Sequence, residues 1–372
     1  MTPLAGLKVV ELARILAGPW AGQLLADMGA DVVKVESPQG DDTRTWGPPF
    51  VEQGGAASAA YFHSCNRGKK SVVIDFRTPG GKAALLDLLA DADVVIENFK
   101  VGGLAKYGLD YASLRATHPR LIYCSITGFG QTGPYAKRAG YDFIIQGMSG
   151  IMSVTGEPDH QPQKVGMAVA DISTGLYASN AILAALHHRH STGRGQHIDL
   201  ALLDVAIATT ANQAMNLLAT GKSPARLGNA HPNIVPYQVF DCADGHVIIA
   251  VGNDGQFQKF CEILELDIAS DPKFATNPVR LENRAALTQI LVAKMVVWAK
   301  DAILAACENA GVPAGPINTF EEVFADPQVI ARGLRMEIDG APSVRPPIRF
   351  SDVDLSLDRP APTLGQHQDL IE

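Results

Sequence analysis

The feature that most constrains the fold of this chain is an alternation of short β-branched runs with helical stretches in its first half. The runs are KVVEL, DVVKVE, SVVID, DVVIEN and LIYCSIT, at residues 8–12, 31–36, 71–75, 93–98 and 121–127. Helical stretches separate them, notably over residues 19–28 and 80–92. Nearly continuous apolar strands separated by helices are typical of parallel βαβ units with both sheet faces covered. We therefore predict a Rossmann-like α/β layer.

The carboxyl ends of these strands are the first place to look for a binding site. In sheets of this kind, ligands bind outside the carboxyl ends of the strands. Those ends carry Ala13 and Arg14, Glu36 and Ser37, Asn98 and Phe99, and Gly128.

The length of 372 residues exceeds what one hydrophobic core normally organises, so we expect two domains. A helical run follows residue 171, and residues 193–219 predict a strand and then a long helix. PYQVF and HVIIAVG flank CADG, which indicates a β-hairpin, with helices near residues 255–264 and 281–299. We predict a large domain over residues 1–200, a linker helix region over 201–229 and a small α+β domain over 230–318. Residues 319–372, with the strand-like IRFSDVDL, are expected to return to the large domain.

The charge balance argues against two classes of partner. A formal net charge of −8, a pI near 5.7 and the lack of a Lys/Arg block give no electrostatic footprint for nucleic acid or an anionic membrane. Five widely spaced cysteines without metal-ligand spacing are typical of reduced thiols in the cytosol. The N-terminus shows no leader pattern, and no apolar run reaches the roughly 18 residues that a membrane span needs. We expect a soluble, cytoplasmic protein.

Asp171 stands among small and apolar residues in VGMAVADISTGLY, just before the helical run. Aspartate is among the best N-cap residues, so spacing alone favours a cap over a catalytic role. The two roles are compatible, because a carboxylate at a helix start is kept ionised by the local dipole.

Two glycine-containing loops have alternative interpretations. GFGQTG at residues 128–133 matches a dinucleotide-binding pattern, but no clear helix opens on its last glycine, which favours a tight turn. GNDG at residues 252–255 either presents backbone N–H groups to a ligand or forms an ordinary strand-to-helix turn.

Arg44 in DDTRTW and Arg67 in NRGKK lie in loops where solvated surface charge is the default. Each guanidinium is nevertheless able to grip a carboxylate or phosphate with two hydrogen bonds. The histidines at residues 187–190 look like the polar end of a helix, and Arg189 among them argues against a metal site.

Several segments together resemble the class III CoA-transferases (CaiB/BaiF), the group of formyl-CoA and carnitine CoA-transferases. They are LAGLKVVELARILAGPWAGQLLADMGADVVKVESP, DVVIENFKVGGLAKYGLD, SITGFGQTGPYAKRAGYD and AVADISTGLYA. DDTRTWGPPF, GNAHPNIVPYQVF and GVPAGPINTFEEVFADPQV are most similar to members that use succinyl-CoA with glutarate or another dicarboxylate. The resemblance implies a Rossmann-like large domain built from both chain ends, a smaller domain, and two subunits interlocked as a homodimer.

The resemblance also implies roles for individual residues. Asp171 corresponds to the covalent nucleophile, and Gly252, Asn253 and Gly255 correspond to a glycine loop that shields the reaction from water. The CoA contacts carried over from the family fall on Asn98, Phe99, Lys106, Lys137 and Tyr141.

The expected chemistry is transfer of CoA through an aspartyl mixed anhydride and an aspartyl-CoA thioester. A carboxylate with an ordinary pKa of about 3.9 is ionised at neutral pH and needs no general base. CoA and its thioesters are therefore expected as substrates, and carboxylic acids as partners, without a prosthetic group or metal.

Substrate choice is indicated by two departures from the family pattern and one hypothesis. Lys106 stands where arginine is common, and Leu16 replaces a glutamine that formyl-CoA transferases use, which argues against a formyl or oxalyl substrate. For a dicarboxylate, we expect Arg67 or Arg44 to receive the distal carboxylate, with His231 nearby. The alternative for either arginine is a CoA phosphate.

Three other functions remain as alternatives. The 2-methylacyl-CoA racemases share the fold but use a histidine where this chain has Tyr141, and a tyrosine with a pKa of about 10 is a poor base at neutral pH. A non-catalytic acyl-CoA-binding protein and, more remotely, a dehydrogenase complete the set.

Overall fold

The computed structural model describes residues 1–371, which divide into two compact units. The large unit comprises residues 1–151, 165–214 and 327 onward, and the small unit comprises residues 152–164 and 215–326. A large unit formed by both ends of the chain is what the sequence led us to expect. The boundaries differ, because residues 201–214 join the large unit and residues 152–164 join the small one.

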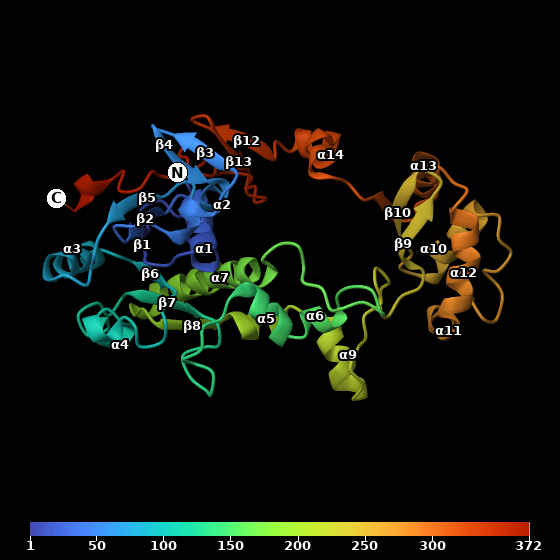
Figure 1. The fold of residues 1–372 in the computed structure, drawn as a ribbon, viewed down its shortest axis with the longest axis horizontal. Helices are drawn as coiled ribbons and strands as arrows, with labels where there is room; N and C mark the ends of the chain where they lie inside the picture. The colour runs from blue at the N-terminus through green and yellow to red at the C-terminus, as the bar shows by residue number, and fades with distance from the viewer. Residues whose placement is uncertain (372) are drawn as a thin grey trace. The chain divides into compact units, whose positions relative to one another are not determined.

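A six-stranded parallel sheet organises the large unit, in the order β5-β2-β1-β6-β7-β8 (Figure 1). Its strands are β1 (Lys8–Glu11), β2 (Asp31–Glu36), β5 (Lys70–Val73), β6 (Val94–Glu97), β7 (Ile122–Thr127) and β8 (His197–Ala201). The five predicted runs and the strand predicted within residues 193–219 each form one of these strands, and every neighbouring pair is parallel.

Helices cover both faces of this sheet, so the large unit has three layers. On one face, α1 (Ala17–Asp27) and α7 (Val169–Thr192) pack on alternate strand residues such as Val9, Val94 and Ile122. On the other face, α3 (Pro79–Ala90) and α4 (Tyr111–Leu114) pack on the intervening residues such as Val10 and Val95. The buried strands thus have apolar side chains on both sides, which is why the sequence reads as continuous apolar runs.

Three short elements and two 3-10 helices complete this part of the large unit. They are α5 (Asp142–Met148), the hairpin β3 (Phe50–Gln53) and β4 (Ala56–Ala59), α2 (Ala60–His63), η1 (Asp42–Thr45) and η2 (Ala105–Tyr107).

The long helix predicted after β8 is broken into two. α8 (Leu202–Ala208) and α9 (Asn212–Thr220) are separated by Ala211, whose φ is 45°. The hydroxyls of Thr209 and Thr210 donate to backbone carbonyls three residues earlier. Such local bonds compete with the helix ladder and favour its end.

The small unit is an α+β structure, as predicted. The hairpin of β9 (Tyr237–Cys242) and β10 (Gly245–Ala250) is joined by β11 (Ala314–Pro316) in an antiparallel sheet. Its remaining elements are α6 (Ile151–Val154), α10 (Asp254–Ile263), α11 (Asn277–Glu282), α12 (Arg284–Met295), α13 (Lys300–Ala310) and α14 (Phe320–Ala325). Its core is separate, formed by residues such as Phe240, Phe257, Phe260 and Leu287.

The C-terminal segment returns to the strands near the N-terminus, as its red trace in Figure 1 shows. Its elements are α15 (Pro327–Ala331), β12 (Arg335–Ile338), β13 (Ala341–Val344) and η3 (Gln368–Leu370). The strand predicted over residues 348–355 is wrong, because this stretch has no regular structure. Only Leu355 packs against the main core there, so a single extended chain satisfies the alternating pattern without a partner strand.

One helix in residues 1–371, α7, has the length and apolar composition of a membrane span, although the sequence had led us to expect none. Ala178, Ile182 and Ala185 of this helix belong to the core cluster that includes α1 and the sheet. Burial in the large unit therefore accounts for part of its apolar composition.

Candidate active site

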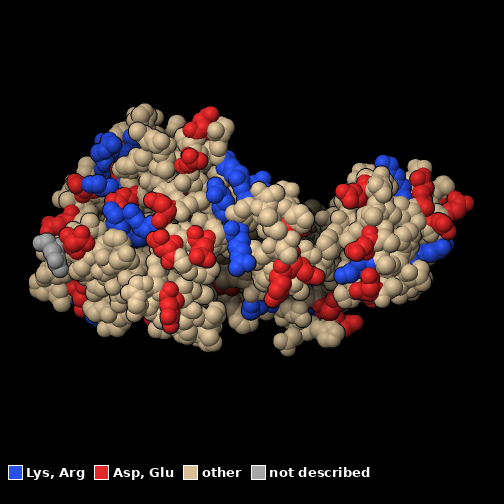
Figure 2. All heavy atoms as spheres, turned by 90° about the horizontal axis from the view of Figure 1, so that it is seen from above, with Lys and Arg blue, Asp and Glu red and all other residues tan. Residues whose placement is uncertain are grey.

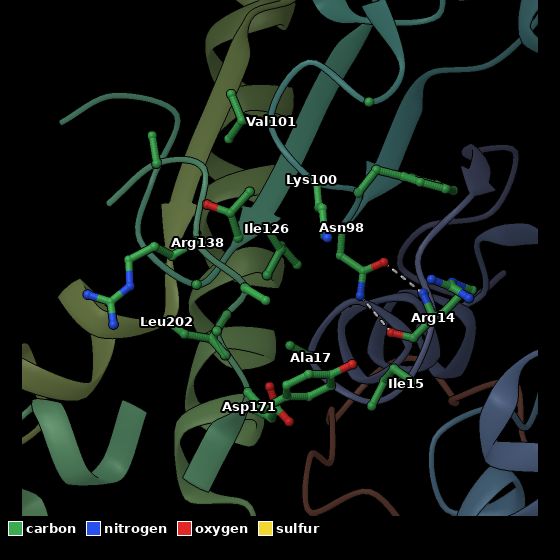
Figure 3. Close-up of a pocket in the computed structure, with 18 of the residues that line it drawn as sticks. Arg14, Ile15, Ala17, Asn98, Lys100, Val101, Ile126, Arg138, Asp171 and Leu202 are labelled. Atoms are coloured by element: carbon green, nitrogen blue, oxygen red, sulfur yellow. Dashed lines mark hydrogen bonds between the residues drawn. The ribbon is translucent and has the colours of Figure 1, made fainter. Parts of the chain in front are cut away.

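A cavity of about 450 Å³ opens at the carboxyl edge of the sheet, where the loops after β1, β6 and β7 and the start of α8 meet. Every lining residue belongs to the large unit. Figure 3 shows Asp171 beside Ile15 and Ala17 at one end of the lining and Lys100 and Val101 at the other. A cavity thus lies at the predicted position beside β1, β6 and β7, whereas Glu36 and Ser37 after β2 do not line it.

Arg14 and Asn98 join the two loops at the centre of this edge. The Asn98 side chain accepts a hydrogen bond from the Arg14 backbone N–H at 3.0 Å and donates one to the Arg14 carbonyl at 2.7 Å (Figure 3). Strands β1 and β6 are neighbours there, and the chain runs outward from them in opposite directions. This is the topological switch point at which open α/β sheets bind their ligands.

Asp171 lies in the first turn of α7, and it is not the N-cap that spacing favoured. The cap position falls on Ala168, which has no capping side chain. Asp142, at the start of α5, caps the helix instead. Its carboxylate accepts hydrogen bonds from the N–H groups of Ala170 at 2.8 Å and Asp171 at 3.4 Å. The carboxylate of Asp171 is therefore left available to the cavity that it lines.

Burial raises the pKa of Asp171 to about 7, with the charge of Asp142 as the second cause. From the sequence we expected an ordinary carboxyl pKa, and burial of this side chain makes that expectation wrong. A pKa near 7 leaves both the ionised and the neutral form of Asp171 available around neutral pH. An anion that is poorly solvated is also a stronger nucleophile than one in water, because it has less hydration to lose.

Apart from this carboxylate, the charged side chains that line the cavity are cationic. Arg14, Arg77, Lys100, Lys106 and Arg138 line the cavity, whereas Asp171 is the one acidic residue among the lining residues. On the face drawn in Figure 2, by contrast, acidic and basic side chains are interspersed. Arg14 and Arg77 pair with Asp42 and Asp75, which leaves Lys100, Lys106 and Arg138 without an ion pair within residues 1–371. The cavity is therefore built to receive an anion.

The residues expected to contact CoA divide into two groups. Asn98, Phe99, Lys106 and Tyr141 line the cavity, whereas Lys137 does not. Its neighbour Arg138 does, with its guanidinium over the ring of Tyr135 at 4.5 Å. Sequence reasoning missed Arg138, although both residues belong to the AKRAGYD segment after β7.

Arg44 and Arg67 are not brought to the cavity. Arg44 forms two hydrogen bonds with Glu36 at 2.7 and 2.8 Å and donates to the Pro362 carbonyl. Arg67 is buried and forms two hydrogen bonds with Asp27, at 2.7 and 2.8 Å. Both guanidiniums have internal carboxylate partners, so this geometry does not support the predicted role of either in binding a substrate carboxylate.

Three predicted site residues and their loop lie in the small unit. Gly252, Asn253 and Gly255 form the turn from β10 into α10, where the Asn253 side chain accepts a hydrogen bond from the Gln256 N–H at 2.9 Å and caps the helix. His231 also belongs to this unit, where its ring lies 5.2 Å from that of Tyr237. A strand-to-helix turn, one of the two interpretations of GNDG, is thus confirmed.

The GFGQTG segment forms a turn after β7, as expected, and no helix opens on Gly133. A Cβ atom on Gly128 would lie 2.6 Å from the Cα of Gly140, so two stretches of backbone meet there. This close approach explains both glycines and brings residues 138–141 to the cavity.

Residues 4–368 match CoA-transferase family III. The chain is 61% identical to the succinate–glutarate CoA-transferase of Agrobacterium fabrum, over 98% of this chain and 94% of that protein. It is 44% identical to the succinyl-CoA:glutarate CoA-transferase of Homo sapiens, over 98% of this chain and 84% of the human protein. The crystal structure of a CAIB/BAIF family protein from Brucella suis has a TM-score of 0.90 and 63% identity, covering 100% of this chain and 98% of that one. The chain therefore belongs to CoA-transferase family III and is an enzyme of that family.

Proposed function

We propose that this enzyme transfers CoA from succinyl-CoA to a dicarboxylic acid such as glutarate, with Asp171 as the covalent nucleophile. The observation that carries the proposal is a single carboxylate at one end of a cavity that otherwise carries five cations. A reactive carboxylate and an anion-binding wall are the two requirements of CoA transfer between acids. The names of the Agrobacterium fabrum and human relatives support the choice of substrates.

In the first half of the reaction, a carboxylate oxygen of Asp171 attacks the carbonyl carbon of succinyl-CoA. The C–S bond breaks, which yields an aspartyl–succinyl anhydride and CoA thiolate. The thiolate then attacks the aspartyl carbonyl carbon, and succinate leaves with the electron pair of the broken C–O bond. The acceptor carboxylate repeats these steps in reverse order, which restores Asp171 and releases the new CoA ester.

Each attack places negative charge on a carbonyl oxygen, which needs hydrogen-bond donors that are already in position. Leu16 and Ala17, at the start of α1, line the cavity with Asp171. The first N–H groups of a helix have no partner within it and lie at the positive end of its dipole. We assign the backbone N–H groups of this turn to the oxyanion.

The lining cations that have no ion pair are assigned to the phosphates of CoA. Lys100, Lys106 and Arg138 line the cavity and have no ion pair within the described residues. Fixing the nucleotide there leaves the pantetheine arm to reach Asp171 along the cavity. In the small unit, we assign the turn of Gly252, Asn253 and Gly255 to shielding of the anhydride from water, on the family resemblance alone.

An interlocked homodimer completes the proposal. Large apolar side chains on α5 and α7 are exposed in the single chain, among them Phe143 at 58%, Ile144 at 48% and Tyr177 at 46%. Exposed apolar patches of this kind mark interaction surfaces, and we assign this one to a second copy of the chain. Light scattering should give twice the mass of one chain, and a monomer at working concentration would contradict the assignment.

The test of the function is a transfer assay with succinyl-CoA and a panel of acids: glutarate, itaconate, malate and mesaconate. We expect wild type to form glutaryl-CoA and Asp171→Asn to form none above background. Deuterium incorporation from heavy water at the α-carbon of a 2-methylacyl-CoA, without transfer, would instead indicate a racemase. Hydrolysis of succinyl-CoA without transfer would indicate a thioesterase.

A further inference from the structure

Ile15, which lines the cavity, has a backbone conformation that its side chain disfavours. Its φ is 72°, in the left-handed region. A β-branched residue is a marked exception there, because its side chain strains the backbone. The strained residue immediately precedes Leu16 and Ala17, whose backbone begins α1. Surrounding contacts must hold this turn in place.

Side chains from three separate parts of the chain supply these contacts. Asn98 binds both polar groups of the Arg14 backbone, as described above. Lys34 donates to the Ala13 carbonyl at 2.9 Å. Both carboxylate oxygens of Asp41 lie within hydrogen-bond distance of the Ile15 N–H, at 3.3 and 3.4 Å. Of these three side chains, Asp41 is therefore the one that accepts a hydrogen bond from the strained residue itself.

A fully buried charge network fixes Asp41 in turn. The ammonium of Lys34 lies 2.9 Å from Asp41 and 3.1 Å from Glu11, and all three side chains have zero exposure. Burial alone would lower the pKa of Lys34, but Asp41 and Glu11 raise it above its usual range. Thr43 adds two hydrogen bonds to Asp41, from its N–H at 3.0 Å and its hydroxyl at 2.8 Å.

Stability alone gives little reason for such a network. Buried ion pairs are often replaceable by apolar residues at no cost, because desolvation offsets the attraction between the charges. The network does place a charged acceptor under a backbone N–H next to the cavity wall. That placement points to a role in the geometry of the site.

We propose that Asp41 is a positioning residue that holds Ile15 in the left-handed conformation and so fixes the first turn of α1 opposite Asp171. The inference rests on the proposed function, because this turn is the one assigned to the oxyanion. If Ile15 relaxed to a negative φ, the following peptide groups would rotate and move away from the reacting carbonyl. A displacement of about 1 Å at a reacting centre costs on the order of 10²-fold in rate.

The first variant is Asp41→Asn, which keeps the shape but turns one oxygen into a donor facing Lys34 or the Ile15 N–H. We expect the rate of covalent adduct formation and kcat to fall about 10–100-fold, with the KM for succinyl-CoA little changed. Counting active sites by the amplitude of adduct formation separates this effect from partial unfolding. A purely structural role would lower the amplitude and the Tm but leave the rate per active site unchanged.

The deciding variant adds Ile15→Gly to Asp41→Asn. Glycine adopts a positive φ without strain, so residue 15 no longer needs the hydrogen bonds to Asp41 to keep this conformation. We expect the double variant to recover most of the kcat that Asp41→Asn loses, with Ile15→Gly alone measured as its reference. Equal rates for the single and double Asp41 variants, or a wild-type rate for Asp41→Asn, would overturn the proposal.

A milder variant covers the case in which Asp41→Asn does not fold. Thr43→Val has the same shape and removes only the hydroxyl bond to Asp41. It should lower kcat severalfold, and Ile15→Gly should again restore it; failure of this rescue also contradicts the proposal. A wild type without adduct or transfer would instead refute the proposed function, so the two failures are distinct.

Discussion

At the scale of single residues, the reactivity of Asp171 depends on a second carboxylate. Asp142 caps the start of α7 and, with burial, raises the pKa of Asp171 to about 7. Asp142 therefore helps to place the proposed nucleophile and, after burial, is the second influence on how much of it is ionised. This arrangement predicts that transfer weakens as pH falls below 7.

Asp142→Asn should shift this dependence. The variant keeps an oxygen for the Ala170 N–H but removes the negative charge, so the pKa of Asp171 should fall by about one unit. The acid limb of kcat/KM against pH then moves to lower pH by the same amount, while the plateau at high pH changes little. Burial, the larger cause, remains. An unshifted acid limb would show that Asp142 does not act on the charge of Asp171.

Arg138 and Lys137 are adjacent cations that offer a matched comparison. Arg138 lines the cavity and Lys137 is exposed outside it. Arg138→Gln should raise the KM for succinyl-CoA roughly 5–30-fold, as expected for 1–2 kcal/mol lost from a charged hydrogen bond to phosphate. Lys137→Gln should leave it unchanged. A raised KM for Lys137→Gln with an unchanged KM for Arg138→Gln would instead support the prediction from the sequence that Lys137 contacts CoA.

The sequence identifies the residues of this site unevenly, for physical reasons. Asp171 is identified by resemblance. Spacing favours it as the N-cap, but the structure places the cap position at Ala168. The N–H groups of the first turn are bound by Asp142, which lies 29 positions before Asp171. Arg67 is 40 positions from its partner Asp27, so no local pattern reveals that its charge is already neutralised. Burial and long-range pairing decide these roles, and neither is visible in a short motif.

At the scale of elements, the contact between α1 and α7 sets the distance between the first turn of α1, which we propose binds the oxyanion, and Asp171, the proposed nucleophile. Gly175 makes this contact possible: a Cβ atom there would lie 2.8 Å from the Ala17 carbonyl oxygen and 2.9 Å from the Cβ of Trp20. The close approach thus involves the backbone of α1 itself.

Gly175→Ala should push these helices apart. We expect a loss of about 1–3 kcal/mol in the free energy of unfolding, the usual cost of overpacking, and a slower adduct rate. Gly80→Ala in α3 is the control, since nothing lies within 4 Å of its added Cβ. That variant should be neutral or slightly stabilising, because alanine favours helix more than glycine does. Equal unfolding midpoints in urea for both variants would contradict the packing argument.

The sequence predicts the elements of the sheet better than those of the periphery. Strands β1, β2, β6 and β7 are buried on both faces, so each is written as a nearly continuous apolar run that local reasoning recognises, whereas the edge strand β8 alternates exposed and half-buried residues. The break at Ala211 and the irregular chain over 348–355 depend on local side-chain bonds and on packing against distant residues. Hydrophobic pattern alone does not encode them.

At the scale of the whole molecule, the large unit is closed by its C-terminal segment. Arg67 donates to the Ser343 hydroxyl and the Val344 carbonyl as well as to Asp27, and Gly68 donates to the Arg359 carbonyl. These contacts tie the loop before β5 to chain that lies more than 270 positions later. Their purpose in this structure is assembly of the large unit.

Arg67→Met should therefore affect stability, and not substrate affinity. Removing the guanidinium leaves the buried Asp27 carboxyl without its partner, which costs about 3–5 kcal/mol. The KM for glutarate in the remaining folded protein should stay at the wild-type value, and adding Asp27→Asn should recover part of the stability. A large rise in the glutarate KM without loss of stability would support a substrate-binding role instead.

The most direct test of the central claim is the intact mass of the protein after brief incubation with succinyl-CoA. Wild type should gain the mass of CoA or of a succinyl group, hydroxylamine should remove it, and Asp171→Asn should never acquire it. An adduct of unchanged yield on Asp171→Asn, or no adduct on wild type during active transfer, would contradict covalent catalysis by Asp171.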